Sequence, residues 1–253
     1  MTGKVMFITG AGSGMGKLAA QRALVAGERV VALDVNAAGL ADLGRSPGLL
    51  TIVADLTDPA AVTAAITQAE EAFGPIDRVY HAAAIMPCGR LLDQDAALIH
   101  KVMAINYGGL VNLAKAVVPG MVARGRGQFV SFSSLAGHAT HIYMGAYNAS
   151  KFAVSAFTEV LHHENRRSGV QFACVCPPAV GTPLLNQARD TVWPRMFDTF
   201  PPLSPDAVLD SIERGLARGE FWIFPGLVAR TYYLMRRLVP RLVWWNIHRM
   251  EKV

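Results

Sequence analysis

A glycine-rich turn near the N-terminus constrains the fold of this chain more than any other stretch. Residues 4–9 form a short apolar run typical of a β-strand, and it leads directly into GAGSGMG at 10–16. Strong helix formers follow at 17–26, and Gly27 then ends the pattern. Glycine suits such a turn because a Cβ would block the close approach of a phosphate to the backbone. The order of strand, turn and helix predicts a pyrophosphate site at a helix N-terminus, with an unliganded tight turn as the alternative.

The next predicted strand, ERVVALD, ends on an acidic residue that bears on the choice of dinucleotide. Asp34 lies eighteen residues after the last glycine of the turn, about where a carboxylate accepts hydrogen bonds from an adenosine ribose. A carboxylate there repels a 2′-phosphate, and neither Ser13 nor Val35 supplies the positive charge that such a phosphate needs. The sequence therefore predicts NAD(H), with NADP(H) less favoured. A cap for a helix that begins near Asn36 is the alternative role of Asp34.

Strand-like and helix-like segments continue to alternate along the chain. Further strands are predicted at 49–54, 76–82, 128–132, 170–176 and 221–224, and helices at 59–73, 94–123, 146–168 and 204–218. Repeated β–α units with apolar strands predict a parallel sheet with helices on both faces. The expected fold is a single-domain, α/β, Rossmann-type doubly wound sheet of about seven strands over residues 1–226, with a C-terminal helical extension. Ligands of such sheets bind beyond the carboxyl ends of the strands, where Thr9, Asp34, Asp55, Ala82, Ser134 and Pro177 all fall.

Composition excludes several other classes of protein. Apolar residues make up 52% and charged residues 17% of the 253 residues, which indicates a globular chain rather than a disordered one. The three cysteines form no disulfide framework, and Cys174-x-Cys176 lacks the second pair or nearby histidine of a metal site, so no metal is predicted. The sparse cysteines suit a reducing cytoplasm. The apolar run at 5–8 is too short for a signal peptide, and no uninterrupted apolar run approaches the length that crosses a bilayer.

Tyr147 and Lys151 are the first candidates for chemistry. Their i, i+4 spacing within a predicted helix places both side chains on one face. Tyrosine has an unperturbed pKa of about 10, and an ammonium at roughly 4 Å would favour the phenolate by about 4 kcal/mol, or around three pKa units. Such a shift would bring the pKa of Tyr147 close to the operating pH of an acid and base. Ser134 precedes the pair and could orient a carbonyl, while an ordinary amphipathic helix with a surface lysine is the alternative.

In combination, these residues resemble the classical short-chain dehydrogenase/reductase family over residues 3–226. The matching features are TGxxxGxG at 9–16, Asp34, Asp55, Asn106, Ser134, the YxxxK pair at Tyr147 and Lys151, and the segment from Pro177 to Thr182. Their joint order and spacing are specific, although each motif alone is not. The resemblance implies an oxidoreductase in which hydride passes between a carbinol carbon and a nicotinamide while a tyrosine moves the hydroxyl proton.

The resemblance also implies a role for each matching residue. Four would form a catalytic tetrad, with Tyr147 as acid/base, Ser134 on the substrate oxygen, Lys151 on the nicotinamide ribose and Asn106 holding a water. Ser133 is the fallback for Ser134. The cofactor would be held by Gly10, Ser13, Gly14, Met15, Gly16, Asp34, Asp55, Leu56, Ala82, Ala83, Tyr147, Lys151, Pro177, Val180 and Thr182.

Two positions depart from the family's usual pattern. Where Asn-Asn-Ala-Gly usually follows the fourth strand, this chain has HAAA at 81–84, so the usual side-chain tie to the neighbouring strands is lost or passes to His81. A structural histidine is the plainer interpretation of that residue. Pro178 replaces the usual glycine after Pro177 and stiffens the segment that leads to the substrate. Neither change removes a tetrad residue, so an active enzyme remains the favoured interpretation.

The segment at 183–203 occupies the position of a mobile lid over the substrate in that family. It is rich in Leu, Trp, Met and Phe. The residues predicted to line the substrate pocket are Met86, Leu135, Met144, Leu184, Leu185 and Trp193, with Ile85 and Ile142 facing the same cavity. An apolar pocket with few polar anchors suits a hydrophobic alcohol or ketone, such as a sterol, a long-chain lipid or a terpenoid. The alternative is that these residues only pack the lid. His138 and His141 are predicted on a surface loop, with contact to a polar substrate group as their alternative role.

The tail at 227–253 carries the basic character of the chain. It holds six Arg or Lys residues against one Glu, whereas the preceding 226 residues carry 18 charges of each sign. Pro240 divides it into two predicted helices, and apolar residues align on one face beside a stripe of basic ones. Tyrosine, tryptophan and arginine suit a membrane interface with anionic headgroups, so peripheral membrane contact is one prediction. Packing of the tail on its own core or on a partner subunit is the other.

The leading interpretation is an NAD(H)-dependent oxidoreductase that acts on a hydrophobic secondary alcohol or ketone. An NADPH-dependent carbonyl reductase on the same scaffold is the alternative among enzymes. A non-catalytic, cofactor-binding protein docked at a membrane is the alternative outside them, and the complete tetrad argues against it. Nucleic acid is not expected as a partner, because the positive charge lies in an apolar, aromatic tail. The resemblance implies a homodimer or homotetramer through the helices at 94–123 and 146–168, and the cysteine content predicts a cytoplasmic location.

Overall fold

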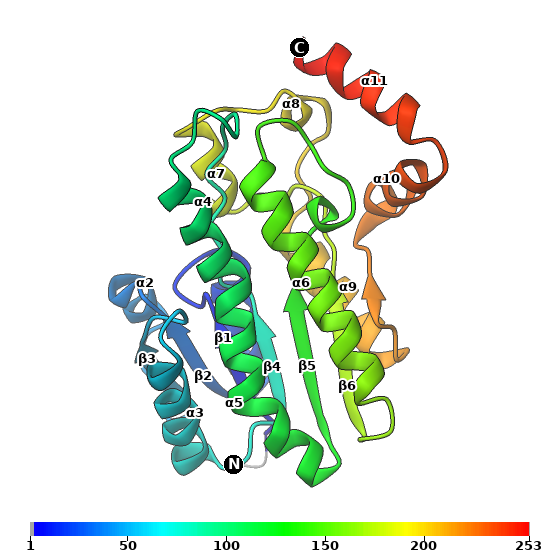
Figure 1. Cartoon of the computed structure of the whole chain (residues 1–253). Helices are drawn as coiled ribbons and strands as arrows, with labels where there is room; N and C mark the ends of the chain where they lie inside the picture. The colour runs from blue at the N-terminus through cyan, green and yellow to red at the C-terminus, as the bar shows by residue number, and fades with distance from the viewer. Residues whose placement is uncertain (1–2, 253) are drawn as a thin grey trace.

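A single parallel sheet forms the centre of the molecule, which the computed structural model describes over residues 3–252 (Figure 1). Its seven strands lie in the order β3-β2-β1-β4-β5-β6-β7, and every neighbouring pair is parallel. The strands are β1 (Val5–Thr9), β2 (Arg29–Asp34), β3 (Leu49–Val53), β4 (Arg78–His81), β5 (Gly127–Phe132), β6 (Val170–Val175) and β7 (Trp222–Ile223). The doubly wound fold predicted from the sequence is confirmed.

Helices cover both faces of this sheet. They are α1 (Gly14–Val25), α2 (Ala37–Ala41), α3 (Pro59–Phe73), α4 (Ala96–Met103), α5 (Gly109–Arg124), α6 (Gly145–Glu164), α7 (Pro183–Arg189), α8 (Met196–Thr199), α9 (Pro205–Ala217), α10 (Gly226–Leu238) and α11 (Pro240–Glu251), with a π-helical turn η1 (Ala104–Gly108) and a 3₁₀ turn η2 (Leu135–Gly137). Residues of α3, α5 and α6 share one core cluster with sheet residues such as Phe7 and Phe129. Residues of α1 and α9 share a second core cluster with Ile8 and Val130. Adjacent strand residues thus point into opposite cores, as a pleated strand requires.

Side chains placed just ahead of the helices explain where several of them begin. Asp58 accepts hydrogen bonds from the N–H groups of Ala60 and Ala61 at 2.9 and 3.2 Å. Ser204 accepts one from the N–H of Ala207 at 3.2 Å. In both cases a proline occupies the first turn, where its missing N–H costs nothing.

The predicted helix at 94–123 runs from 96 to 124, interrupted by the π-helical turn η1. This turn ends at two consecutive glycines, because Gly108 is its last residue and Gly109 begins α5. In the described part of the chain this is the one helical stretch long and apolar enough to span a membrane. Its composition is explained by burial, since Leu110, Leu113 and Met121 are fully buried against the sheet.

The carboxyl ends of the central strands meet at one edge of the sheet. Thr9 lies opposite His81, and His81 lies opposite Ser131. The chain first builds β2 and β3 on one side of β1 and then β4 to β7 on the other, so its direction of winding reverses between β1 and β4. In sheets of this kind ligands bind beyond the strand ends at this reversal. This edge is at the top of Figure 1, below α7 and α8.

The tail forms two helices, α10 and α11, and the division predicted at Pro240 is confirmed. In Figure 1, α10 lies beside the end of the sheet, and α11 crosses toward α8. Ala229, Val243 and Ile247 are buried, so one face of the tail packs on the rest of the chain. The prediction that the tail packs on its own core is therefore confirmed for that face.

Candidate active site

The glycine turn leaves no room for side chains where it meets the neighbouring backbone. A Cβ on Gly10, whose φ is +70°, would lie 2.7 Å from the backbone nitrogen of Ala83. A Cβ on Gly16 would lie 2.2 Å from the carbonyl oxygen of Gly10. Ser13 is the N-cap residue of α1 and its side chain makes no capping hydrogen bond. The first N–H groups of this helix, which have no intrahelical acceptor, are therefore suited to an anion.

Asp34 is held beside this turn by two backbone amides. Its carboxylate accepts hydrogen bonds from the N–H groups of Gly12 and Asn36, each at 2.9 Å. Helix α2 is capped instead by Asn36, whose side chain accepts from the N–H of Gly39 at 3.1 Å. The capping role considered for Asp34 is therefore wrong, and its carboxylate is fixed at the end of β2.

The residues predicted to hold a dinucleotide lie along a continuous path. At one end, Asp55 is exposed after β3 and accepts a hydrogen bond from the N–H of Thr57 at 2.8 Å, while Leu56 is buried. At the other end, a cavity of about 1090 Å³, its open mouth included, is lined by Met15, Ala82, Tyr147, Lys151, Pro177, Val180 and Thr182. Close-approach glycines, a helix N-terminus and a carboxylate at a strand end lie between them. These residues fit a nicotinamide dinucleotide.

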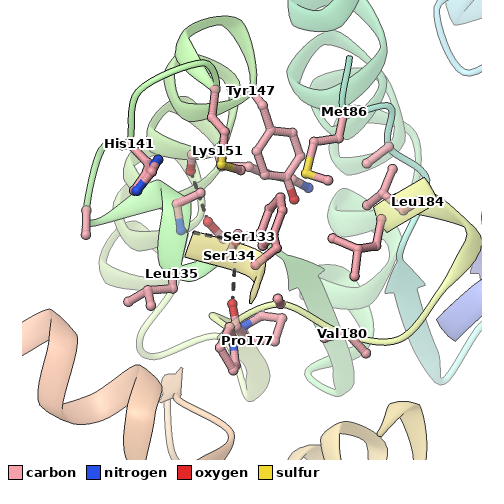
Figure 2. A pocket seen from close by; sticks show the side chains of 18 of the residues that line it. Met86, Ser133, Ser134, Leu135, His141, Tyr147, Lys151, Pro177, Val180 and Leu184 are labelled. Carbon is pink, nitrogen blue, oxygen red and sulfur yellow. Dashed lines mark hydrogen bonds between the residues drawn. The ribbon is translucent and has the colours of Figure 1, made fainter. Parts of the chain in front are cut away.

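Three residues of the predicted tetrad meet at the wall of this cavity (Figure 2). Tyr147 and Lys151 lie one turn apart on α6, and Ser134 follows β5 by two residues. Lys151 Nζ donates a hydrogen bond to the carbonyl of Phe132 at 2.6 Å and lies 5.7 Å from the centre of the Tyr147 ring. Ser134 Oγ accepts from the N–H of Ala136 at 3.1 Å, donates to the carbonyl of Pro177 at 3.5 Å, and interacts with the Tyr147 phenol, whose pKa it lowers. The phenol, hydroxyl and ammonium groups therefore share one site.

Burial controls the acid–base character of this group. It raises the pKa of Tyr147 to about 12, with the hydrogen bond to Ser134 acting in the opposite direction. It lowers the pKa of Lys151 to about 8. The prediction that Lys151 brings the pKa of Tyr147 near neutrality is wrong for the protein by itself, because desolvation of the buried phenol has the largest effect on its pKa.

Asn106 lies behind the site, in the π-helical turn η1. Its side-chain oxygen accepts from the N–H of Ile85 at 2.8 Å, and its amide nitrogen donates to the carbonyl of Ile85 at 3.0 Å and to Ser150 Oγ at 2.9 Å. It thereby ties the segment after β4 to α6, one residue before Lys151. Both side-chain polar atoms bond to protein, so the structure shows Asn106 as a tie between elements, while its predicted water-holding role stays a prediction.

The two neighbouring serines have different environments. Ser133 Oγ donates to the carbonyl of Lys151 at 3.0 Å and bonds Ser155 Oγ at 2.7 Å. These bonds commit it to α6, whereas the hydroxyl of Ser134 reaches Tyr147. The geometry therefore favours Ser134 over the fallback.

The substrate side of the cavity is apolar. Among the residues predicted to line it, Met86, Leu135, Met144, Leu184 and Leu185 do so. Trp193 does not, and that prediction is wrong. Its ring packs on Phe197 with centroids 5.0 Å apart, and its Nε1 donates to Asp198 at 2.8 Å. It braces the lid from within, and the predicted cavity positions of Ile85 and Ile142 are also not found.

Part of the cavity wall comes from lid residues that the sequence analysis did not name and from the tail, which it did not place at the cavity. Met196, Phe197 and Phe200 of the lid line it, and so do Val228 and Tyr232 of α10. The helical spacing of apolar residues in the tail was the sequence feature that could have indicated this, because it predicts a buried face that could be assigned to the cavity. The tail is therefore a structural part of the candidate active site.

Comparison with known proteins now identifies the family. The model of the family described as short chain dehydrogenase matches residues 4–193. The chain belongs to the short-chain dehydrogenase family. A 2-keto-3-deoxy-L-fuconate dehydrogenase of Xanthomonas campestris is 32% identical over 210 residues, which cover 79% of this chain and 69% of that protein. Mouse 17-beta-hydroxysteroid dehydrogenase 13 is 30% identical over 233 residues, which cover 88% and 74%.

Solved structures of the family agree with this short-chain dehydrogenase over nearly its whole length. A Burkholderia phymatum enzyme in complex with NAD superposes with a TM-score of 0.85 at 26% identity, covering 95% of both chains. A Sphingobium yanoikuyae enzyme in complex with NADPH superposes with a TM-score of 0.79 at 27% identity, also covering 95% of both. The fold is thus shared with members that hold either dinucleotide.

Three histidines around the site of this short-chain dehydrogenase are wholly or partly buried. His81 Nδ1 bonds Thr9 Oγ1 at 3.0 Å between β4 and β1, and burial lowers the pKa of His81 to about 3. This bond supports a structural role, while the buried Nε2 of His81 has no hydrogen-bond partner in the described part of the chain. The prediction that His138 and His141 lie on the surface is wrong. The ring of His138 packs 5.2 Å from that of Tyr233 in α10, and His141 is only 7% exposed. Burial lowers the pKa of His138 to about 4 and also lowers that of His141.

Proposed function

We propose that this short-chain dehydrogenase transfers hydride between NAD(H) and a hydrophobic secondary alcohol or ketone, with Tyr147 as the acid/base. The observation that carries the proposal is one cavity with three kinds of wall. The wall includes Met15 and Thr182 beside the glycine turn, three tetrad side chains (Ser134, Tyr147 and Lys151), and apolar residues of the lid and the tail. Tyr147 therefore lies between the expected cofactor and an apolar substrate space.

The side chains divide the work of proton transfer. A nicotinamide dinucleotide held by these residues would accept or donate the hydride and, when oxidised, would add a positive charge to the cavity. Tyr147 exchanges the proton of the substrate hydroxyl, and Ser134 holds the substrate oxygen. The carbonyl of Phe132 orients the ammonium of Lys151. With a pKa near 12, Tyr147 keeps its proton until charge in the cavity favours the phenolate.

Asp34 supports NAD(H) over NADP(H). Its carboxylate is fixed by two amides beside the turn, where it repels a 2′-phosphate. Lys17, a nearby cation on α1, pairs with Asp42 at 2.9 Å. Relatives of known structure hold NAD or NADPH, so the preference rests on these residues of this chain.

The apolar wall supports a hydrophobic substrate. Methionine, leucine and phenylalanine side chains dominate it. In the described part of the chain, the polar residues that line it outside the tetrad are Ser133, Thr140, His141, Thr182 and Tyr232. A sterol, a long-chain secondary alcohol or a terpenoid matches such a lining. The relatives are named for both a steroid and a sugar acid, and the lining favours the former kind of molecule.

The proposal is tested by following formation of the reduced nicotinamide with NAD⁺ or NADP⁺ and a panel of sterols, long-chain secondary alcohols and hydroxylated sugar acids. We expect turnover with NAD⁺ and the apolar alcohols. Tyr147→Phe should lower kcat by about 10²-fold or more while NADH binding, measured by fluorescence, is kept. Undiminished turnover in Tyr147→Phe contradicts the acid/base assignment. A preference for NADP⁺ contradicts the role of Asp34, and activity restricted to sugar acids contradicts the substrate class.

A further inference from the structure

The C-terminal helices have an outer face that no part of the described chain covers. Leu227 is 81% exposed, Leu238 is 77% exposed and Trp245 is 57% exposed. Leu234 and Leu242 are also exposed, and the spacing 227, 234, 238 places one row of leucines along α10. Residues of the opposite side, such as Val243 and Ile247, are buried. Packing within the chain therefore explains the apolar residues of the inner face but not those of the outer face.

Positive charge surrounds this apolar row. Arg230, Arg237, Arg241 and Arg249 are exposed, and none of them pairs with a carboxylate among residues 3–252. The guanidinium of Arg249 lies 5.5 Å from the ring of Trp245. The one acidic residue of the tail, Glu251, turns inward with its side chain 2% exposed. The outer face thus combines large apolar side chains with arginines whose charge is not neutralised by a carboxylate of the described residues.

The cavity opens beside this face. Val228 of α10 and Phe200 of the lid line the cavity, yet they are 41% and 44% exposed. Side chains that both line a cavity and reach solvent mark its mouth. Val228 directly follows Leu227, so the mouth adjoins the apolar row.

We propose that the outer face of α10 and α11 docks on an anionic lipid bilayer and presents the cavity mouth to it. Leucine and tryptophan would enter the interface, and the arginines would contact the anionic headgroups. A second copy of the chain is a poorer match, because the 226 residues before the tail carry 18 charges of each sign and offer no acidic excess. A lipid-dissolved substrate would reach Tyr147 directly from the bilayer; this last step rests on the proposed function.

Vesicle co-sedimentation of the full chain, without cofactor or substrate, tests the docking. We expect recovery with phosphatidylcholine vesicles containing phosphatidylglycerol, weaker recovery with phosphatidylcholine alone, and loss of binding as salt is raised. The double variant Leu238→Ser with Trp245→Ser should bind the anionic vesicles at least tenfold more weakly. Val25→Ser is the matched control, because Val25 is 91% exposed at the end of α1, far from the tail in sequence, and should bind like the wild type.

Equal recovery of the double variant and the wild type overturns the docking. Equal binding to anionic and neutral vesicles also overturns it. A third contrary result is that neither protein binds vesicles, while light scattering shows a dimer for the wild type and a monomer for the double variant. The cavity mouth is tested separately with an apolar secondary alcohol dissolved in the vesicles. Wild-type turnover should exceed that of the double variant at least tenfold, while both oxidise a water-soluble alcohol equally. If no alcohol is oxidised but vesicle binding follows the expected pattern, the proposed function fails and the docking stands.

Discussion

The two walls of the cavity are built in opposite ways. On the cofactor side, the glycine turn meets backbone atoms so closely that a Cβ on Gly16 would lie 2.2 Å from a carbonyl oxygen. On the substrate side, the wall consists of side chains from the lid and from α10, which lie far apart in sequence. Main-chain contacts tolerate almost no substitution, whereas a side-chain wall changes its shape with each residue. The family can therefore keep one cofactor site and vary its substrates.

The substrate wall also depends on a long-range clamp. The carboxylate of Glu251 accepts hydrogen bonds from the N–H groups of Arg195 and Met196, at 3.2 and 3.3 Å, where α8 begins. One of its oxygens lies 3.6 Å from Nε2 of His141, a buried residue of the loop before α6. The last helix thus holds the lid in place. The cofactor wall needs no such clamp because the strand ladder supports it.

The largest effect should come from adding one methyl group to the cofactor wall. Gly16→Ala should lower the free energy of unfolding by about 3 kcal/mol or more and abolish NADH binding, because the backbone must move to admit the Cβ. Urea denaturation and NADH fluorescence measure the two effects. Gly44→Ala is the control, since Gly44 has a φ of +77° with nothing near its Cβ position, and it should cost only about 1–2 kcal/mol. Similar results for both variants would show that the turn is not tightly packed.

Acid should weaken the cofactor wall through His81. Its pKa is about 3 in the native protein and 6.5 in the unfolded chain, so between these values only the unfolded chain binds the proton. The free energy of unfolding should therefore fall as pH drops below 6.5, by about 1.4 kcal/mol per pH unit from this histidine. In His81→Asn that contribution should disappear from the urea midpoints measured between pH 7 and 5. His138→Phe should remove a nearly equal part of the slope over this range, because the native pKa of His138 is about 4 and so also lies below pH 5. An unchanged slope in His81→Asn would contradict the burial argument.

The smallest effect should come from loosening the clamp. Glu251→Gln keeps an acceptor but removes the charge, which weakens its bonds to the lid by about 1 kcal/mol. The KM for an apolar substrate should rise about fivefold, while kcat and NADH affinity stay unchanged. Glu220→Gln is the matched control, because Glu220 pairs with Arg218 on the exposed surface and should leave KM unaltered. A loss of NADH affinity in Glu251→Gln would show that the two walls are not independent.

The sequence by itself determined the sheet, the glycine turn, the strand-end position of Asp34 and the pairing of Tyr147 with Lys151 on one helix face. These depend on short-range geometry: the periods of strands and helices, the steric freedom of glycine and the spacing of neighbours on a helix turn. Only the tertiary structure decided that Trp193 braces the lid, that His138 and His141 are covered, and that the pKa of Tyr147 rises. Burial could not be predicted locally, because the groups that exclude water from a side chain come from distant parts of the chain. Tyr233 covers His138 from α10, and Glu251 reaches His141 from the last helix. No local pattern around either histidine contains that information.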